Sequence, residues 1–438
     1  MKREEQSGAA ASMLVQIEKP IYGGAFLARV EGKAVFVPLT LPGEQVRVRI
    51  VEERRGYASA EVEAIAQAAA ERVEAACPHF ATCGGCAYQH ASYAQQLDFK
   101  QTILRETLER AGVPAPERID VLSAEPWGYR NRIRLAFDAA GNVGYRGRRS
   151  HAVVALTECP IAAPLLVKAA LAAAEVLRTA TASLKASEIA LFARGDESAL
   201  LVSLTVRSGS KKLFEQFAQL LKERVPELAG AELLVEEPVR GRRPAAPPRR
   251  VAEWGWPSIR YQAGGFEYRV DQGAFFQVNR FLVDALLERV TDGHKGRVAW
   301  DLFAGVGLFA RRLAENFDEV VAVESAPMAK AALKENLQAT GGRAVAASTL
   351  EFLRRAEGKQ RPDLVVVDPP RTGLGAEVAE HLAALAAPSL VYVSCDPATL
   401  ARDLKALLAS GYAIESLAVA DLFPQTFHLE TVVQLRKS

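Results

Sequence analysis

The chain has 438 residues, of which 49% are hydrophobic and 24% charged, and its formal net charge is +2. This composition is that of a globular protein, and no uninterrupted apolar run approaches the roughly 18 residues that a membrane-spanning helix needs. At about 150 residues per domain, the length predicts a multidomain protein. The first residues, MKREEQSGAAAS, lack the apolar segment of an export signal. We therefore expect a cytoplasmic protein with no membrane partner.

Residues 13–66 form short runs in which apolar and polar residues alternate, interrupted by glycine and proline. This pattern predicts a small antiparallel β-barrel, which we place at residues 12–67. In EQVRVRIV the alternation directs Val46, Val48 and Ile50 inward and Arg47 and Arg49 outward. A basic outer face suits a barrel of the oligonucleotide-binding (OB) type, although a purely structural barrel has the same pattern.

Cysteines are few and unevenly spaced. They lie at Cys77, Cys83, Cys86, Cys159 and Cys395. An odd number in a chain without an export signal argues against disulfides. The first four include one C-x-x-C pair and supply four thiolates, which suits either zinc or an iron–sulfur cluster. Zinc ribbons usually have two such pairs, and a proline follows Cys159 as it often follows a cluster cysteine, but the spacing leaves both metals open.

The segment after the cysteines begins with a helix and continues with strands. Helical periodicity runs from Ser92 to about Ala111 and stops at Gly112, so we expect a helix at 92–112 that could pack on the C-terminal domain. Strand patterns dominate residues 129–155, and a mixed α/β pattern continues to about residue 270. We place a central α/β domain at residues 72–270. Within it, VRGRRPAAPPRR, residues 239–250, has no periodicity and predicts an exposed loop.

Arginines cluster at the start of the strand-rich stretch. Arg130, Arg132 and Arg134 are candidates for contacts with phosphate, although a solvated basic strand pair has the same pattern. The aromatic residues between them, Tyr129, Phe137 and Tyr145, could stack on unpaired bases. For Phe137, packing in the core is the stronger interpretation.

From about residue 297 the pattern changes to buried strands that alternate with helices. The strands are RVAWDLF, VVAVE, DLVVVD, SLVYVS and a terminal TVVQLRK. They predict a parallel sheet covered on both faces, in a Rossmann-like α/β domain that we place at residues 271–438. Ligands of such sheets bind at the carboxyl ends of the strands.

A nucleoside cofactor is indicated by DLFAGVGLFA, residues 301–310, where Gly305 and Gly307 allow a tight turn close to a ligand. Glu324 follows at the spacing of an acid that binds ribose hydroxyls. NAD enzymes and methyltransferases share both features. The third strand distinguishes them, because it ends in Asp368 followed by two prolines and Arg371, as in many methyltransferases.

A candidate nucleophile lies at the end of the next strand. A lone cysteine on an apolar strand usually serves packing, but Cys395 is at the strand exit, and a helix beginning at Pro397 is predicted to lower its pKa. A thiolate that adds to carbon 6 of uracil makes carbon 5 nucleophilic, and a base must then remove the carbon-5 proton. Glu430 is the candidate base and His428 its competitor.

Together, DLFAGVGLFA, DPPRTGL, SCDPATLARDL and HLETV resemble the RNA uracil-C5 methyltransferase family. The resemblance extends upstream to DQGAFFQVN and to the barrel, which resembles a TRAM domain. It implies a class I fold in which Gln277, Phe303, Gly305, Glu324 and Asp368 contact S-adenosylmethionine. It also implies that Cys395 attacks carbon 6 and that Glu430 takes the proton. Some members have a polar residue where this chain has Leu308.

The resemblance also specifies a metal and a substrate. Members that act on ribosomal RNA are similar at CPHFATCGGCAYQ and hold a [4Fe-4S] cluster, which implies such a cluster on Cys77, Cys83, Cys86 and Cys159 and 23S rRNA as the substrate. RNA cytosine-C5 methyltransferases carry a second cysteine in the proline motif, and DPPRTG has none. The remaining alternatives are a tRNA uridine-C5 methyltransferase and a non-catalytic RNA-binding protein. No obligate protein partner is expected.

Overall fold

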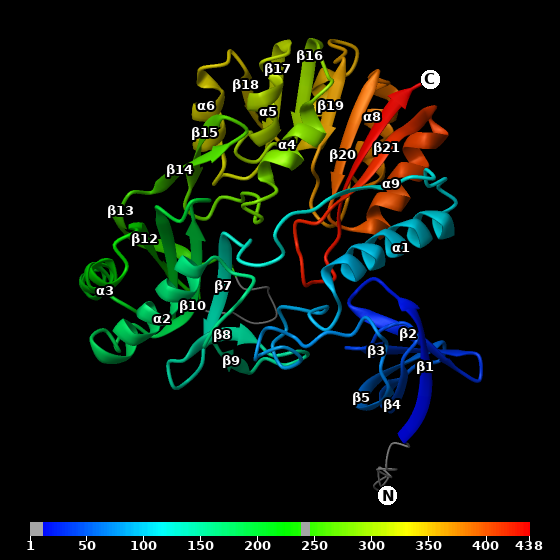
Figure 1. Cartoon of the computed structure of the whole chain (residues 1–438). Coiled ribbons are helices and arrows are strands. Elements are labelled where there is room, and N and C mark those ends of the chain that lie inside the picture. The colour runs from blue at the N-terminus through cyan, green and yellow to red at the C-terminus, as the bar shows by residue number, and fades with distance from the viewer. Residues whose placement is uncertain (1–11, 238–245) are drawn as a thin grey trace, which may run out of the picture.

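The computed structural model describes residues 12–237 and 246–438 as a barrel, a central α/β part and a larger C-terminal α/β part (Figure 1). The first 11 residues lie outside the described residues, as do residues 239–245 of the expected loop. The loop was predicted to extend too far, to residue 250. Arg249 and Arg250 instead begin a strand, in which they pair with Val235 and Leu234. Within the described ranges, no helix is both long and apolar enough to cross a membrane.

The N-terminal barrel is closed by five strands in the order β1-β2-β3-β5-β4. They are β1 (Ser12–Pro20), β2 (Ala25–Val30), β3 (Lys33–Pro38), β4 (Gln45–Glu53) and β5 (Tyr57–Gln67). Val46 and Val48 are fully buried, Ile50 is half-buried, and Arg47 and Arg49 are exposed, as the alternation predicted. The interior is thus filled by apolar side chains while the arginines face solvent.

A long helix connects the barrel to the C-terminal part. Helix α1 (Tyr93–Ala111) begins after the cap residue Ser92 and ends at Gly112, whose φ of 73° requires the left-handed conformation. Its buried residues Ile103, Leu104 and Leu108 share an apolar core with the C-terminal sheet. Strand β6 (Asp120–Leu122) then joins the edge of that sheet. A segment far upstream in the sequence therefore belongs to the C-terminal core.

The central part is a seven-stranded sheet in the order β13-β12-β11-β10-β7-β8-β9. Its strands are β7 (Arg132–Phe137), β8 (Val143–Arg146), β9 (Val153–Ala155), β10 (Ala186–Ala193), β11 (Leu200–Val206), β12 (Leu228–Val235) and β13 (Arg249–Gly255). Helices α2 (Pro164–Thr179) and α3 (Lys211–Arg224) pack on one face through an apolar core. The hairpin of β14 (Ser258–Ala263) and β15 (Phe266–Asp271) leads into the C-terminal part.

The C-terminal sheet has the order β18-β17-β16-β19-β20-β22-β21-β6, with β22 antiparallel to its neighbours. Its remaining strands are β16 (Gly296–Leu302), β17 (Phe317–Glu324), β18 (Arg343–Ala346), β19 (Leu364–Val367), β20 (Ser389–Ser394), β21 (Tyr412–Ala420) and β22 (Glu430–Lys437). Because β18 precedes β19, the strand that ends at Asp368 is the fourth of this alternation, not the third as predicted. Strands β18, β21 and β6 were not predicted.

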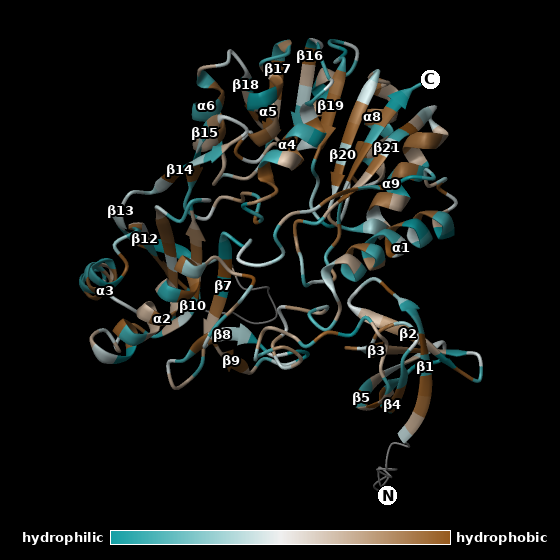
Figure 2. Ribbon diagram, in the orientation of Figure 1, coloured by the Kyte–Doolittle hydropathy of each residue, from teal (hydrophilic) through white to brown (hydrophobic). Residues whose placement is uncertain are grey.

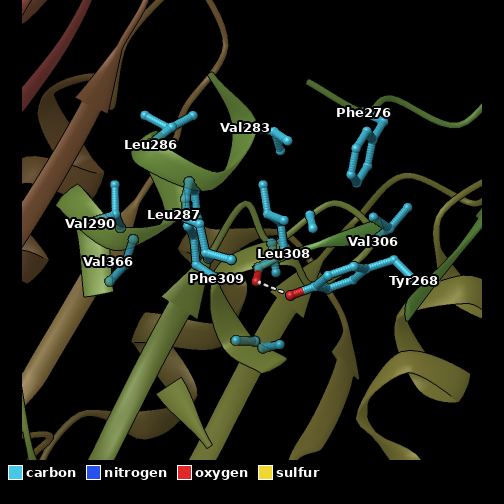
Figure 3. Packing of buried hydrophobic residues seen from close by; sticks show 14 of the residues in the cluster. Tyr268, Phe276, Val283, Leu286, Leu287, Val290, Val306, Leu308, Phe309 and Val366 are labelled. Atoms are coloured by element: carbon cyan, nitrogen blue, oxygen red, sulfur yellow. Dashed lines mark hydrogen bonds between the residues drawn. The ribbon is translucent and has the colours of Figure 1, made fainter. Parts of the chain in front are cut away.

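Helices cover both faces of this sheet, as expected. One core contains residues of α4 (Val283–Thr291), α5 (Leu308–Leu313) and α6 (Lys330–Gln338). The opposite core contains residues of α1, α7 (Thr349–Ala356), α8 (Ala376–Leu385) and α9 (Pro397–Ala409). The strands in the middle of the sheet are strongly hydrophobic (Figure 2). Figure 3 shows the first core, where Tyr268 donates to the carbonyl of Leu308 (3.1 Å) and so fixes the hairpin to the start of α5.

Candidate active site

The loop between β16 and α5 has an unusual backbone. Phe303, Gly305 and Gly307 all have positive φ, at 66°, 54° and 88°. A Cβ at Gly307 would lie 2.8 Å from the Leu333 side chain, so this glycine is needed for close packing. A Cβ at Gly305 would meet open space, so that position is free to approach a ligand. Phe303 is not glycine, and its left-handed backbone marks this loop as a functional one.

Carboxylates gather at the carboxyl ends of the same strands. Glu324, at the end of β17, accepts from the backbone N–H of Gly305 (2.8 Å) and of Ala326 (2.6 Å). Asp368 follows β19, and burial raises its pKa to about 7. Asp301, which the sequence analysis did not single out, is fully buried, and burial raises its pKa to about 8. One oxygen of Asp301 accepts from Ala310 N–H (2.9 Å), while Oδ1 has no hydrogen-bond partner among the residues that the structure describes. Such an edge favours a positively charged ligand.

Gln277 lies in the segment between β15 and α4. The residue is 8% exposed, and its carbonyl oxygen accepts from the side-chain amide of Asn131 in the central part (3.0 Å). The Asn131 amide also donates to Tyr261 (3.1 Å). The buried Asn131 therefore fixes the segment that carries Gln277 against the central sheet.

Cys395 and Glu430 lie opposite each other at the end of two neighbouring antiparallel strands, β20 and β22. The last pair in register between β20 and β22 is Ser394 with Thr431, whose hydroxyl donates to the Ser394 carbonyl (3.1 Å). Cys395 is the next residue after this pair on one strand, and Glu430 precedes it on the other. Directly opposite residues of antiparallel strands have Cα atoms about 4.5–5.5 Å apart. The structure thus brings the two predicted catalytic residues together.

The predicted lowering of the Cys395 pKa is wrong for the ligand-free protein. Burial, and then the negative charges of Glu430 and Asp368, raise the thiol pKa to about 12, and Arg371 opposes this effect. The helix that follows does not compensate, because its first N–H groups are occupied. Asp396 caps α9 by accepting from Ala398 N–H (3.0 Å) and Thr399 N–H (2.9 Å). The helix N-terminus therefore stabilises the Asp396 carboxylate instead of the thiolate.

His428, the competing base, is held by its neighbours. Its Nδ1 lies 3.2 Å from the Arg371 guanidinium, and its ring packs edge-on against Phe423. Burial and nearby cations lower its pKa to about 4, so the imidazole is neutral at pH 7. Glu430 is the opposite case: burial and the charge of Asp368 raise its pKa well above the ordinary value, and Arg371 opposes them.

The barrel also reaches the site, through a residue that sequence reasoning missed. Tyr22, in the turn between β1 and β2, has its hydroxyl 3.5 Å from the Cys395 carbonyl and its ring edge-on to Phe427. Burial and the charge of Asp396 raise its pKa. No motif in the sequence marks Tyr22, because the contact spans almost the whole chain.

The four remaining cysteines line one cavity. Cys77, Cys83, Cys86 and Cys159 surround it together with Arg130 and Tyr145. The N–H of Gly85 donates to the Cys83 sulfur (3.3 Å). Among the residues that the structure describes, no three His, Cys, Asp or Glu side chains converge as the ligands of one metal ion do. The cysteines therefore share a cavity without a single-ion geometry.

The candidate RNA-binding residues have different surroundings. Arg130 and Arg132 are half-buried and line a cleft of about 640 Å³, which Arg134 also lines from an exposed position. Tyr129 is fully buried and donates to the Pro424 carbonyl (3.0 Å), so the suggestion that it stacks on bases is wrong. Phe137 packs against the central core. Tyr145 packs there too and lies between the cleft and the cysteine cavity.

Comparisons with known proteins match both ends of the chain. A family model described as tRNA (Uracil-5-)-methyltransferase matches residues 257–438, and a TRAM domain model matches residues 11–62. An uncharacterized RNA methyltransferase of Streptomyces avermitilis is 35% identical, with 96% of this chain and 97% of the relative covered. A 23S rRNA (uracil(1939)-C(5))-methyltransferase of Klebsiella pneumoniae is 34% identical, with 94% and 92% covered. The chain belongs to the RNA uracil-C5 methyltransferase family.

The enzyme is thus an S-adenosylmethionine-dependent RNA (uracil-5-)-methyltransferase with an N-terminal TRAM barrel, which confirms the predicted family and enzyme class. The fold agrees. The structure of Pyrococcus abyssi tRNA (uracil-54, C5)-methyltransferase with S-adenosyl-L-homocysteine has a TM-score of 0.77 at 24% identity, covering 97% of this chain and all of that one. The confirmed parts of the predicted fold are the barrel and the C-terminal methyltransferase domain.

Proposed function

We propose that the enzyme methylates carbon 5 of a uridine in 23S rRNA through a covalent bond between Cys395 and carbon 6 of the base. The observation that carries this proposal is the position of Cys395 and Glu430. Both lie just beyond the last residue pair of β20 and β22, close to Asp368. The relative from Klebsiella pneumoniae supports ribosomal RNA as the substrate. The tRNA named for the family model and for the Pyrococcus abyssi enzyme is the alternative.

The proposed reaction has three steps. The Cys395 thiolate adds to carbon 6, and the electrons of the 5,6 double bond move into an enolate. Carbon 5 then takes the methyl group, and its bond to the cofactor sulfur breaks to leave S-adenosylhomocysteine. Finally the Glu430 carboxylate removes the proton from carbon 5, the double bond re-forms, and the carbon–sulfur bond to Cys395 breaks. The thiolate is restored, and Glu430 holds one proton.

The charges around Cys395 explain why the proposed reaction needs S-adenosylmethionine in the site. Burial, and then the negative charges of Glu430 and Asp368, raise the pKa of the Cys395 thiol and favour its neutral form. S-adenosylmethionine supplies an electrophilic methyl group and a positive charge. We place it between Gln277 and the residues at the strand ends, which are Phe303, Gly305, Glu324 and Asp368. Arg371 favours the thiolate and the Glu430 carboxylate, so it supports both of their roles.

The test combines two variants with RNA that contains 5-fluorouridine, whose fluorine cannot leave as a proton. Wild-type enzyme is expected to form a stable covalent complex with this RNA, and Cys395→Ala is expected to form none and to make no 5-methyluridine. Glu430→Gln should still form the adduct with natural RNA but release it slowly. Methylation by Cys395→Ala would overturn the mechanism. Product mapping on 23S rRNA and tRNA transcripts decides the substrate, and label in tRNA alone or in cytosine would overturn it.

For the cysteine cavity we propose a [4Fe-4S] cluster. All four ligands line the cavity, and the Gly85 N–H points at a sulfur as donors to cluster ligands do. Iron and acid-labile sulfide in anaerobically purified enzyme would support a cluster, and stoichiometric zinc would contradict it.

For Arg130, Arg132 and Arg134 we propose contacts with RNA phosphates. Arg130 lies two residues before β7, Arg132 and Arg134 lie within it, and all three line the cleft between the central and C-terminal parts. Replacing any one of them by methionine should weaken RNA binding and reduce its salt dependence by about one counterion. Unchanged salt dependence in all three variants would contradict this assignment.

A further inference from the structure

The cleft beside these arginines is built on one face of the central sheet. Helices α2 and α3 cover the other face. On the cleft face, Arg134, Ala190, Ser203 and Glu232 lie in register on four neighbouring strands. The wall opposite is formed by Gln272, Gly273, Val278 and Met328 of the C-terminal part. A volume of about 640 Å³ lies in the range of small-ligand sites.

Glu232 is a buried acceptor without a full set of partners. The residue is 2% exposed, and one oxygen accepts from the Ser203 hydroxyl (2.7 Å). Among the described residues, the other oxygen, Oε2, has no hydrogen-bond partner. Arg250 lies at ion-pair distance, 3.8 Å from Oε2, and is also paired with Glu253 at 2.5 Å. Buried carboxylate oxygens are almost always paired, so this one is available to a ligand that donates a hydrogen bond.

The arginine side of the cleft has positively charged hydrogen-bond donors, which complement the acceptor on Glu232. The Arg132 guanidinium lies 4.4 Å above the Phe192 ring, which holds it flat. Within the part of the chain that the structure describes, the buried Nε atoms of Arg132 and Arg130 have no hydrogen-bond partner, whereas Arg134 is paired with Glu188 at 3.0 Å. Two cations with unused donors therefore face the cleft, and these suit a phosphate.

The two sides are separated by a distance that suits a nucleotide. Three strand spacings of about 4.8 Å lie between β7 and β12, or about 14 Å between backbones. The long arginine side chain shortens that gap. Phe192, Leu201 and Val278 supply apolar surface between the polar ends. A phosphate at one end, an apolar middle and a hydrogen-bond acceptor at the other match an unpaired ribonucleotide.

We propose that this cleft binds a second unpaired nucleotide of the substrate RNA, whose phosphate lies on Arg130 and Arg132 and whose exocyclic amino group donates to Glu232. The proposal rests on the proposed RNA methylation and deepens it, since it names a base that the enzyme reads besides its target. A carboxylate accepts from the exocyclic amino groups of cytosine, adenine or guanine, whereas uracil has no such group and offers only its ring N3–H. We therefore expect the cleft to select against uridine at one position near the target.

The cleft is linked to the catalytic part by Gln272, whose side-chain amide donates to the Ser203 hydroxyl (3.4 Å) and whose segment continues to Gln277. Ser203 in turn donates to Glu232. A nucleotide in the cleft would thus lie on the chain segment that leads to the proposed cofactor glutamine.

The experiment uses the full-length enzyme and an RNA stem-loop around the methylated uridine. Each unpaired nucleotide near the target is replaced in turn by uridine, and equilibrium affinity is measured without cofactor. Wild-type enzyme should lose about 10-fold in affinity at one position only, within the range for one base contact. Glu232→Gln, which removes the charge but retains the shape and a bond to Ser203, should lose much of the affinity and respond less to that replacement. Glu215→Gln, at an exposed glutamate of α3 on the other face of the central sheet, is the matched control and should behave as wild type.

Position-specific coupling to Glu232 but not to Glu215 supports the subsite. Equal responses of the Glu232→Gln and Glu215→Gln variants, or no sensitive position, would overturn it, and so would unchanged RNA affinity in both Glu232→Gln and Arg132→Met. Because affinity is measured without catalysis, failure of the proposed function is separable: it would show as wild-type enzyme that binds the RNA but makes no 5-methyluridine.

Discussion

The phenolic oxygen of Tyr22 lies 3.5 Å from the carbonyl oxygen of Cys395, although 373 residues separate the two in the chain. The Tyr22 ring also packs edge-on against Phe427, three residues before Glu430. One side chain from the barrel thus touches both segments that carry the proposed catalytic groups. The barrel therefore forms part of the wall of the proposed catalytic site.

Replacement of Tyr22 by alanine is expected to lower kcat about 10-fold or more, because a small displacement of catalytic groups is costly. Tyr22→Phe keeps the ring contact with Phe427 and should lose less. The affinity for S-adenosylmethionine should change little. Tyr57→Ala, which removes an exposed barrel tyrosine packed on Phe36, is the control. Single-turnover methylation with saturating RNA measures the effect, and equal rates for the Tyr22→Ala and Tyr57→Ala variants would show that the contact is incidental.

A buried ion pair holds the loop before Glu430. Lys100 of α1 and Asp421, just after β21, are fully buried and 2.5 Å apart, and Lys100 also donates to the Phe423 carbonyl (3.0 Å). Lys100→Met leaves a buried carboxylate without its partner and should lower the free energy of unfolding by about 3–5 kcal/mol. A second change, Asp421→Leu, should restore part of the loss. Urea unfolding measures both.

The matched control for this pair is the surface pair of Lys19 and Glu106, which lies at 2.7 Å. Lys19→Met should cost less than about 1 kcal/mol, since exposed pairs contribute little. If Lys100→Met were as mild as Lys19→Met, the buried pair would not be what stabilises the loop.

Asp301 should make the stability of the ligand-free enzyme depend on pH. Burial raises its folded-state pKa to about 8, above its ordinary value of 3.8. Between these two values the folded state binds more protons than the unfolded state, so this group's contribution falls as the pH rises through that window. The slope for one group is at most about 1.4 kcal/mol per pH unit. Asp301→Asn should remove it from urea-unfolding curves recorded between pH 5 and pH 8.

Asparagine retains an acceptor for the Ala310 N–H, so the folded loop should persist in that variant. The exposed Asp318 of β17 provides the control, because Asp318→Asn should leave the pH slope unchanged. Identical slopes for wild type and Asp301→Asn would contradict the raised pKa.

Sequence patterns predicted the structural features that depend on residues close together in the chain. Alternation located the barrel and the faces of β4, and the capping residues Ser92 and Gly112 gave the ends of α1. The strand-end rule placed Glu324, Asp368 and Cys395 at one edge of a sheet, because each followed a recognisable apolar strand. These predictions used local physical rules, and the structure agrees with them.

The missed features depend on contacts between distant segments. Strand β6 has three residues and pairs with β21 from the other end of the chain, so no periodicity reveals it. The Cys395 pKa was predicted with the wrong sign because the effect of the helix was assigned to the thiol, whereas Asp396 takes the free N–H groups. Tyr129 looked like a stacking residue, but its partner is the carbonyl of Pro424, almost 300 residues later.

The cysteine segment is hydrogen-bonded to the same catalytic loop. The N–H groups of Ala87 and Tyr88, which follow Cys86, both donate to the Gln425 carbonyl (2.9 and 3.0 Å). Gln425 has a φ of 67°, and its side chain and N–H are both bonded to Gln96 of α1 (2.9 Å each). The loop is thus held in a strained conformation partly by residues next to a proposed cluster ligand.

Loss of the proposed cluster is therefore expected to loosen the loop at residues 421–430. Cys86→Ser should reduce iron content and speed amide hydrogen exchange in this loop, while exchange in β16 and β17 stays slow because their core is intact. Gln96→Ala should speed exchange in the loop without loss of iron, which separates the hydrogen bonds from the metal. Cys395→Ser is the control for a change of thiol, and its exchange pattern should match wild type. If Cys86→Ser lost its iron while the loop kept wild-type exchange, the cysteine segment would be stabilised independently of the catalytic loop.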